Sequence, residues 1–368
     1  MDKLKKTNKS VVVAMSGGVD SSVAAALLKK EGFDVIGITL KMWSYNDIPV
    51  QDSGCCSLES IYNAKNVSEQ LGFNHYTLDF TEKFTDTVIN DFISEYMSGN
   101  TPNPCVLCNK VIKWSALLEK AESLGADYLA TGHYAKVKRN EINNRYNIAA
   151  ADYKTKDQSY ALWSISQYAL SKTIFPLGIY SKEKIRDIAT EMNLKPANTP
   201  DSQEICFVPN NNYRELLEIK IPDINEKVGD GDILYKDKTI GTHKGYPYYT
   251  IGQRRGLNIA LGKPIYVSKI DPEKNIITVD DEEGLLQKEF IIKDINLMMF
   301  DKLPEPLDVS VKIRYKDKGA TAVIEQTDDN HIKVTFNSPK KSITPGQSAV
   351  FYSGEDVVGG GIIEKVYT

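Results

Sequence analysis

A short apolar run that leads through a glycine turn into a helix constrains the fold of this chain most. Residues 11–15 are wholly apolar, as in a parallel strand that is buried on both faces. The turn Ser16-Gly17-Gly18 follows directly, and residues 20–31 then have helical periodicity until Gly32. Two adjacent glycines let the backbone bend sharply and come close to a ligand. This order of elements predicts an α/β unit whose turn can bind an anion.

The alternation of strand and helix continues through the first half of the chain. We expect further strands at 34–40, 75–78 and 127–131, and helices at 57–71, 81–97, 109–124 and 181–192. Alternation of this kind predicts an α/β fold with a doubly wound parallel sheet and helices on both faces.

The character of the sequence changes near residue 208, where helical periodicity fades and glycines become frequent. We expect a small central domain of loops and short strands, followed by a C-terminal β-barrel. Barrel strands are predicted at 309–315, 320–326, 331–336 and 348–352. The predicted domains are residues 1–208, 209–280 and 281–368.

Charge and cysteine content narrow the class of protein. The chain has 45 Lys and Arg against 49 Asp and Glu, so its formal net charge is −4 and any nucleic-acid contact must come from local patches. The five cysteines are odd in number and unevenly spaced, which favours a reducing compartment over a secreted disulfide framework. The start of the chain lacks the apolar stretch of a signal peptide, and no apolar run approaches the roughly 18 residues of a membrane span. We therefore expect a cytoplasmic protein that does not contact a membrane.

The glycine turn carries further chemistry in the string Ser16-Gly17-Gly18-Val19-Asp20-Ser21-Ser22. It lacks the Gly-Lys-Ser/Thr of a Walker A loop and the Gly-x-Gly-x-x-Gly of a dinucleotide site. Serine hydroxyls can add donors for an anion, and Asp20 can orient them or hold Mg²⁺. The alternative is a plain strand-to-helix turn. The string resembles the signature of the PP-loop ATP pyrophosphatases, which split ATP between the α and β phosphates and adenylate an oxygen of their substrate.

Two cysteines, Cys105 and Cys108, stand three residues apart at the start of a predicted helix. The helix dipole and nearby lysines favour the thiolate form, and both thiols would lie on one face. Three interpretations remain open for this pair: half of a zinc site, a redox dithiol, or thiols that react beside the nucleotide. Cys206, taken alone, reads as a buried structural cysteine. The adjacent Cys55 and Cys56 are interpreted as loop or core residues.

Seven motifs together resemble one family over nearly the whole chain and in order, namely the tRNA-specific 2-thiouridylases of bacteria and mitochondria. The motifs are residues 14–22, 101–113, 130–135, 156–160, 200–207, 249–257 and 344–347. That family replaces the C2 oxygen of the wobble uridine in certain tRNA anticodons with sulfur. The resemblance implies a tRNA-uridine 2-sulfurtransferase with a PP-loop catalytic domain.

The resemblance also implies roles for two thiols. Cys108 is the nucleophile, and Cys206 carries the incoming sulfur as a persulfide. ATP adenylates the carbonyl oxygen of uracil, a poor leaving group, and the persulfide then delivers sulfur while a Cys108–Cys206 disulfide forms. The implied partners are tRNA and a persulfide-donating relay protein or a cysteine desulfurase.

The binding residues follow from the same resemblance. The ATP-binding positions would be Ala14, Met15, Ser16, Gly17, Gly18, Val19, Asp20, Ser21, Leu40 and Gly132. The tRNA-contacting positions would be Asn103, Pro104, Cys105, His133, Lys156, Asp157, Gln158, Arg314, Tyr315 and Gln347.

Basic residues near the C-terminus add a pattern of their own. Lys312, Arg314, Lys316 and Lys318 alternate with other residues, so strand geometry would place all four on one face suited to phosphates. A merely solvated strand face is the alternative. The pair Arg254-Arg255 is a further candidate for contact with phosphates.

One position departs from the family pattern, because many members have Asp where this chain has Cys105. Sulfur-transferring relatives use three thiols to hold an iron–sulfur cluster, and this chain has three candidates in Cys105, Cys108 and Cys206. A cluster-bearing version of the reaction therefore stays open.

Two alternative functions remain as well. One is another PP-loop adenylating enzyme, such as an amidotransferase-type synthetase or a tRNA lysidine synthetase. The other is an RNA-binding protein that uses ATP or a metal only structurally.

Overall fold

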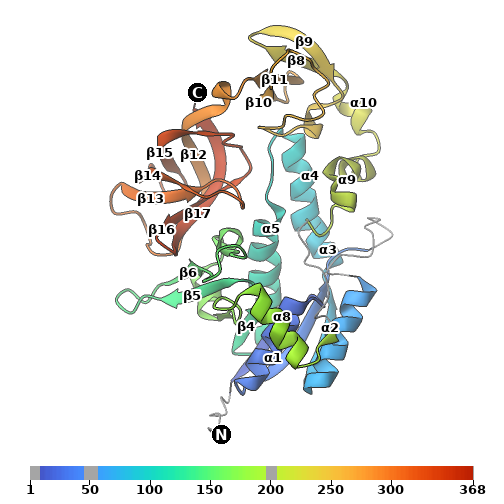
Figure 1. Ribbon diagram of the computed structural model, residues 1–368, viewed down its shortest axis with the longest axis vertical. Coiled ribbons are helices and arrows are strands. Elements are labelled where there is room, and N and C mark those ends of the chain that lie inside the picture. The colour runs from blue at the N-terminus through green and yellow to red at the C-terminus, as the bar shows by residue number, and fades with distance from the viewer. Residues whose placement is uncertain (1–8, 45–56, 196–204, 368) are drawn as a thin grey trace. The chain divides into compact units, whose positions relative to one another are not determined.

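The computed structural model describes residues 9–44, 57–195 and 205–367 (Figure 1). The chain divides into two compact units. Unit 1 contains the described residues up to Val88, together with Cys105–Asn211 and Glu355–Val357. Unit 2 contains Ile89–Pro104, Asn212–Gly354 and the described residues from Val358 on. The earlier cysteine pair Cys55-Cys56 and residues 200–204 of the Cys206 motif lie outside the described residues.

Unit 1 is built on a five-stranded parallel sheet in the order β3-β2-β1-β4-β7. The strands are β1 (Ser10–Ala14), β2 (Asp34–Lys41), β3 (Asn74–Asp79), β4 (Tyr128–Thr131) and β7 (Thr173–Ile174). Because β1 pairs with β2 on one side and with β4 on the other, the winding direction reverses beside β1. The predicted doubly wound sheet is confirmed, and its switch point lies between β1 and β4.

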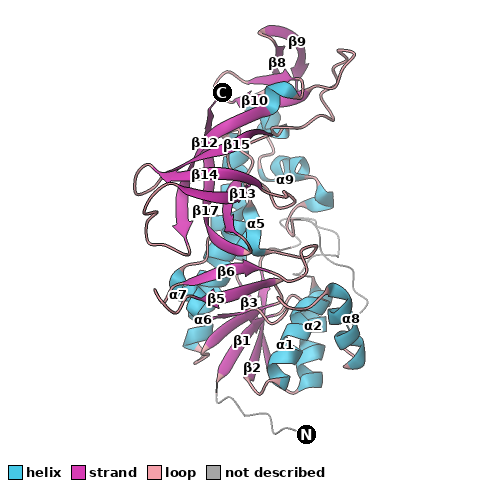
Figure 2. Ribbon diagram, turned by 60° about the vertical axis from the view of Figure 1, so that its left-hand side comes forward, coloured by secondary structure: helices cyan, strands magenta, loops and turns pink. Residues whose placement is uncertain are grey.

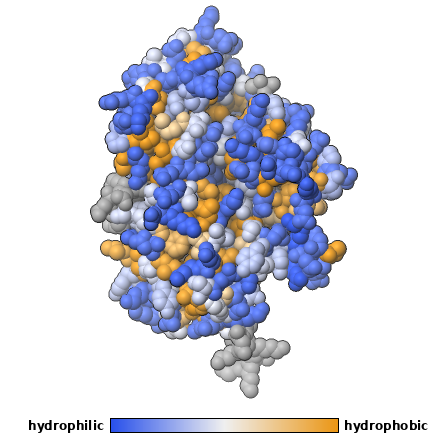
Figure 3. Space-filling view, turned by 180° about the vertical axis from the view of Figure 1, so that it is seen from behind, coloured by the Kyte–Doolittle hydropathy of each residue, from blue (hydrophilic) through white to orange (hydrophobic). Residues whose placement is uncertain are grey.

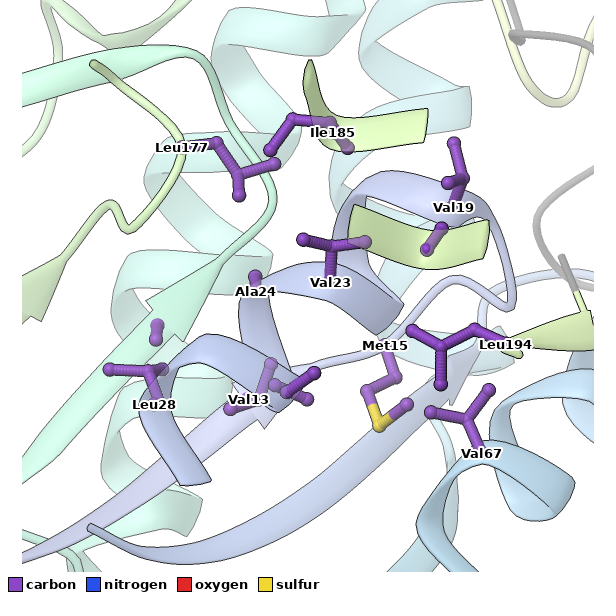
Figure 4. Packing of buried hydrophobic residues seen from close by; sticks show 14 of the residues in the cluster. Val13, Met15, Val19, Val23, Ala24, Leu28, Val67, Leu177, Ile185 and Leu194 are labelled. Atoms are coloured by element: carbon purple, nitrogen blue, oxygen red, sulfur yellow. The ribbon is translucent and has the colours of Figure 1, made fainter. Parts of the chain in front are cut away.

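Helices cover both faces of this sheet (Figure 2). On one face lie α1 (Val19–Lys30), α2 (Leu58–Leu71) and α8 (Lys182–Glu191). Their apolar side chains pack with those of β1 in a shared core that includes Val13, Val23, Val67 and Ile185 (Figure 4). Burial of these side chains fixes the helices against the strands at about 1.5–3 kcal/mol for each large one.

Capping residues explain where two of these helices begin. Ser57 accepts a hydrogen bond from the backbone N–H of Ser60 at the start of α2, and Ser181 does the same for Lys184 at the start of α8. Gly72 ends α2 in the left-handed conformation that glycine adopts without strain. The predicted helices at 57–71 and 181–192 are confirmed in these elements.

Two longer helical segments contain π-helical stretches. The first consists of α3 (Thr81–Phe84), η1 (Thr85–Ile89) and α4 (Asn90–Met97). The second consists of α5 (Pro104–Leu107), η2 (Cys108–Leu117) and α6 (Leu118–Ser123). They correspond to the helices predicted at 81–97 and 109–124. Wide π-helical turns are frequent at functional sites, and η2 begins at Cys108.

Further elements of unit 1 connect β4 to α8. They are β5 (Ala135–Arg139), β6 (Tyr146–Ala150), η3 (Ser159–Leu162) and α7 (Gln167–Ser171). The strands β5 and β6 form an antiparallel hairpin that the sequence patterns did not predict.

Unit 2 contains a four-stranded sheet in the order β10-β11-β8-β9. The strands are β8 (Gly231–Tyr235), β9 (Lys238–His243), β10 (Tyr266–Asp271) and β11 (Ile276–Asp280). Two helices precede them, α9 (Tyr213–Lys220) and α10 (Ile224–Val228). The expectation of loops and short strands alone was therefore wrong here, because Leu216 and Leu217 bury an apolar helix face of only two turns.

The second part of unit 2 is a closed barrel of six strands. They are β12 (Leu286–Leu297), β13 (Leu307–Lys312), β14 (Ala320–Gln326), β15 (Ile332–Lys341), β16 (Ser348–Ser353) and β17 (Asp356–Tyr367). Closure follows because β12 pairs with both β15 and β17, which leaves no open edge between them. Phe290, Phe336 and Phe351 are fully buried in its core. The predicted C-terminal β-barrel is confirmed.

The predicted face of four cations is wrong. Strand β13 ends at Lys312, and the chain then turns, so Arg314, Lys316 and Lys318 do not continue a strand. The Asp317 carboxylate causes this turn, because it accepts hydrogen bonds from the backbone N–H groups of Ile313 and Gly319.

Among the described residues, the structure has no helix that is long and apolar enough to cross a membrane. Figure 3 shows hydrophilic side chains over much of one face, with smaller areas of apolar side chains between them.

Candidate nucleotide and thiol site

The loop between β1 and α1 has the geometry of an anion site. Gly17 has a φ of +75°, and a Cβ atom there would come within 2.1 Å of the Ser60 carbonyl oxygen, so only glycine fits. Gly18 is the N-cap of α1 and has no side chain that could cap the first turn. The amides of that turn are therefore left to an incoming anion, which the helix dipole also favours.

Serine hydroxyls hold this loop in shape. Ser21 Oγ accepts from the backbone N–H of Ser16 at 3.1 Å and donates to the Gly18 carbonyl at 3.2 Å. Ser22 Oγ donates to the same carbonyl at 2.9 Å and is fully buried. Only Ser16 of the three is exposed. Ser21 and Ser22 thus fix the loop, whereas the sequence suggested all three as donors to the ligand.

Asp20 is held by two residues from distant parts of unit 1. Lys182 Nζ donates to both carboxylate oxygens at 2.8 Å, and the Tyr134 hydroxyl donates to Oδ1 at 2.6 Å. The described residues contain no group of three or more His, Cys, Asp or Glu side chains placed to hold a metal ion. The Asp20 carboxylate is thus engaged by Lys182 and Tyr134, and its expected roles toward the serine hydroxyls and Mg²⁺ stay predictions.

The end of β4 touches the loop directly. A Cβ atom on Gly132 would lie 2.7 Å from the backbone nitrogen of Ser21 and 2.8 Å from the carbonyl carbon of Asp20. Contact this close is possible only for glycine, so Gly132 and the loop meet at the switch point of the sheet. Leu40, near the end of the neighbouring strand β2, is buried.

His133 follows Gly132 and lies among aromatic rings. Its ring lies 5.6 Å from that of Trp114 and 6.1 Å from that of Phe175, and its Nδ1 is 2.7 Å from Thr131 Oγ1. Burial, with a smaller contribution from the Lys113 charge, holds the pKa of His133 well below its usual value. The imidazole is therefore neutral at pH 7.

The helix that carries Cys108 is anchored to this same edge. Trp114, on the same helix, contacts His133 just after β4 and donates from Nε1 to Thr173 Oγ1 in β7 at 2.8 Å. Asn109, next to Cys108, donates to the Ala161 carbonyl at 2.9 Å. Cys108 is buried with 8% of its surface exposed. Cys105 is exposed, a difference that the prediction of a shared helix face did not anticipate.

The segment that carries Cys206 is anchored by its neighbour Phe207. The Phe207 ring packs edge-on against Phe84 at 5.5 Å, and Phe84 lies 6.4 Å from the ring of Trp43. Phe84 belongs to the helix that follows β3, and Trp43 follows β2. Cys206, which is half-buried, is thus one residue from an aromatic cluster at the carboxyl edge of the sheet.

Two of the expected tRNA contacts near β5 are engaged inside unit 1. The Asp157 carboxylate accepts from the backbone N–H groups of Ala151 and Ser159, and Gln158 Oε1 accepts from the backbone N–H of Tyr134 at 2.9 Å. These bonds hold the segment beside Tyr134. Lys156 is half-buried in the same turn.

The other expected tRNA contacts belong to unit 2. Gln347 Nε2 donates to the carbonyls of Thr101 and Pro102 at 2.9 and 3.2 Å, so it braces the segment that contains Asn103 and Pro104. Arg314 and Tyr315 are exposed on the turn after β13. Arg254 and Arg255 are exposed on a loop of the same unit.

Lys182 and Tyr134, the two partners of Asp20, were not predicted from the sequence. Neither belongs to a motif that names its role, and Lys182 is 162 residues from Asp20. The one local signal is a lysine in the first turn of the helix predicted at 181–192, where the helix dipole disfavours a cation.

Comparisons with known proteins agree with this layout. A family model described as "tRNA methyl transferase HUP domain" matches residues 9–210. Models described as "tRNA methyl transferase PRC-barrel domain" and "Aminomethyltransferase beta-barrel domain" match residues 223–281 and 287–363.

Curated relatives match over almost their full length. The tRNA-specific 2-thiouridylase of Salinibacter ruber is 48% identical over 361 residues, which cover 97% of this chain and 94% of that protein. The corresponding protein of Clostridioides difficile is 46% identical over 359 residues, which cover 97% of this chain and 99% of that protein. Among solved structures, a 4-thiouridine synthetase bound to RNA and ATP shares 17% identity at a TM-score of 0.36, over 58% of this chain and 51% of its own. Similarity at that level carries no argument.

Proposed function

Since the chain belongs to the family of tRNA-specific 2-thiouridylases and is a tRNA sulfurtransferase, we propose that it uses ATP to replace the C2 oxygen of the wobble uridine with sulfur. One structural observation supports this reaction independently of the family. Aromatic contacts tie the segments of Cys108 and Cys206 to the same edge of the sheet that presents the phosphate loop. Two thiols at that edge would suit ATP-driven thiolation, in which a thiol pair acts beside the nucleotide.

The first step of the proposed reaction activates the uridine. The O2 atom attacks the α-phosphorus of ATP, the bond to the β-phosphate oxygen breaks, and pyrophosphate leaves. The loop of residues 16–22 and the N-terminus of α1 bind the phosphates through backbone N–H groups. The close contact of Gly132 with Ser21 keeps this end of β4 against the loop. Leu40 and Met15 supply buried apolar surface at the ends of the adjacent strands.

The second step transfers sulfur from a persulfide on Cys206. The Cys108 thiolate attacks the inner sulfur of that persulfide, the S–S bond breaks, and the outer sulfur leaves as hydrosulfide with the bonding electron pair. Hydrosulfide then adds to C2, and AMP departs with the original oxygen atom. The protein is left with a Cys108–Cys206 disulfide, so each turnover needs a thiol reductant and a new sulfur atom from a persulfide-donating protein.

Several residues of the chain are proposed to contact the tRNA. Arg314 and Tyr315, exposed after β13, would contact the phosphate backbone and a base. Neutral His133 can exchange one hydrogen bond with the uracil, which must leave the anticodon stack to react. Gln347 acts indirectly, since it fixes the segment of Asn103 and Pro104 that leads into Cys105.

An iron–sulfur version of the reaction is the alternative to this route. Cys105 is exposed, Cys108 is buried and Cys206 is half-buried. We propose the persulfide route, in which Cys105 stands where many members of the family have Asp. Iron and sulfide analysis of protein purified without oxygen tests this choice, and stoichiometric iron that is lost in Cys105→Ser would overturn it.

The experiment that tests the proposed function is thiolation of a tRNA transcript by purified protein with ATP and a persulfide donor. Thiolated tRNA is measured by retardation in a mercury gel and by mass spectrometry of nucleosides. Cys108→Ser and Cys206→Ser should each abolish thiolation while ATP binding stays unchanged. Full turnover in either variant would favour another PP-loop adenylating enzyme, and no pyrophosphate release by the wild type would favour a protein that only binds RNA.

A further inference from the structure

A lysine from a distant helix contacts the phosphate loop. Residues 16–22 contain neither lysine nor arginine, although the loop is built to receive a polyphosphate. Lys182, the first residue of α8, extends to this loop and bonds both oxygens of Asp20 at 2.8 Å. Its Nζ also lies 6.0 Å from the centre of the Tyr134 ring. The loop therefore has a lysine, but one supplied 162 residues later in the chain.

The position of Lys182 is costly for stability alone. The residue is 8% exposed, and a lysine that far from water loses its hydration. It also stands in the first turn of α8, where the helix dipole opposes a positive charge. Only the lysine of this pair is buried, since 32% of the Asp20 side chain is exposed, and such an ion pair is weak evidence for stability, so a functional reason for the ammonium is expected.

The surroundings hold Lys182 in place. The helix that carries it packs on α1 through Ile185 (Figure 4), and both Ile185 and Ala189 are fully buried. Asp20 and Tyr134 define the direction of the ammonium, and Gln158 in turn fixes the backbone of Tyr134. A charge held this rigidly next to an anion site binds without the entropy loss of a mobile side chain.

We propose that Lys182 is the phosphate-binding cation of this site, with Asp20 and Tyr134 as the residues that position its ammonium. The inference rests on the proposed use of ATP and adds a residue to that same site. When ATP binds, the ammonium meets phosphate oxygens, and in the absence of nucleotide Asp20 balances its charge. The contribution should therefore scale with the phosphate charge of the ligand and be absent for the nucleoside alone.

Competition against a fluorescent ATP analogue tests this assignment on the full-length protein without tRNA. The ligands are ATP, inorganic pyrophosphate and adenosine. Lys182→Met should weaken ATP and pyrophosphate by about tenfold or more and leave adenosine within about twofold. Lys182→Gln should lose as much, because it keeps a hydrogen bond to Asp20 without the charge, and Lys182→Arg should retain most of the affinity. Lys184→Met, an exposed lysine on the same helix, is the matched control and should bind like wild type.

Thermal melting of each variant shows whether it folds. If Lys182→Met does not fold, Lys182→Gln still provides the test. Wild-type affinity for ATP in Lys182→Gln would overturn the role of Lys182 and leave the proposed function intact. Equal losses for ATP and adenosine would overturn it as well, since they would indicate general damage to the loop. A wild-type protein that binds neither ATP nor pyrophosphate would overturn the proposed function together with this inference.

Discussion

The lysine at the phosphate loop of unit 1 is buried and paired, whereas the cations on the turn after β13 in unit 2 are exposed. Lys182 is buried, paired with Asp20 at 2.8 Å and held by a packed helix. Arg314 and Lys316 are exposed on a turn whose shape depends on the Asp317 carboxylate. A buried, fixed charge can stabilise a reacting group strongly, whereas exposed charges bind a polyanion at little desolvation cost and release it again. This difference fits the proposed function, in which unit 1 carries out the chemistry and the turn binds tRNA reversibly.

The largest effect should come from crowding the loop. Gly132→Ala would place a methyl group 2.7 Å from the Ser21 nitrogen, so either the loop or β4 must move. We expect a loss of about 1–3 kcal/mol in stability and a clear loss of ATP affinity, because the loop amides lose their alignment. Calorimetry and nucleotide titration measure the two effects.

The control for this variant is Gly241→Ala in unit 2, where the added Cβ meets only the flexible Ile259 side chain at 3.3 Å. It should leave ATP binding unchanged. Unaltered ATP affinity in Gly132→Ala would contradict this difference between the two regions, since the rigid packing of the loop would then be unimportant for ATP binding.

Much of unit 1 could be predicted from local sequence because its signals are local. The apolar run at 11–15, the glycine pair and the helical periodicity after it all lie within about one turn of the feature they specify. The pairing of Asp20 with Lys182 could not be predicted, because it depends on how α8 docks onto α1 across 162 residues. Site residues taken from family motifs remain predictions, and so do the roles of the two thiols.

Unit 2 shows where periodicity misleads. The alternating cations from Lys312 to Lys318 matched a strand, but Asp317 captured the backbone N–H groups of Ile313 and Gly319 and bent the chain. Such a side chain competes with the strand ladder for the same donors. The helices α9 and α10 were missed for the opposite reason, because elements of eight and five residues carry too little periodicity.

A medium effect is expected at the exposed turn. Arg314→Gln removes one exposed cation and should weaken tRNA binding by about 3- to 10-fold. The slope of log affinity against log salt concentration should fall by the amount expected for the loss of about one phosphate contact. ATP affinity should not change. Filter binding at several salt concentrations provides the measurement.

Lys302→Gln is the matched control for Arg314→Gln. Lys302 is an exposed lysine of unit 2 that precedes β13 in the chain and pairs with Asp329. Equal losses of tRNA affinity in both variants would mean that only overall charge matters, and that the turn is no specific binding surface.

The smallest effect concerns the carboxylate that shapes this turn. Burial alone would raise the pKa of Asp317, but hydrogen bonds from Ile313 N–H and Lys340 outweigh it and lower the pKa below 3.8. Because the folded pKa is depressed, the carboxylate stabilises the barrel above about pH 4, and this stabilisation is lost as the pH falls through the folded pKa.

Asp317→Asn should therefore lower the melting temperature at pH 7 and weaken tRNA binding by only about twofold, since the turn loosens but keeps its cations. The difference in melting temperature between variant and wild type should shrink as the pH is lowered below 4. A constant difference down to pH 3 would show that the Asp317 charge does not hold the turn.

The central claim is that the phosphate loop and the thiols of Cys108 and Cys206 act in one site. The most direct measurement is a single turnover of persulfide-loaded protein with ATP and tRNA, followed by non-reducing peptide mass spectrometry. We predict a Cys108–Cys206 disulfide in amounts equal to the thiolated uridine, and none when ATP is replaced by a non-hydrolysable analogue. Thiolated tRNA that accumulates while both cysteines remain thiols would contradict the account.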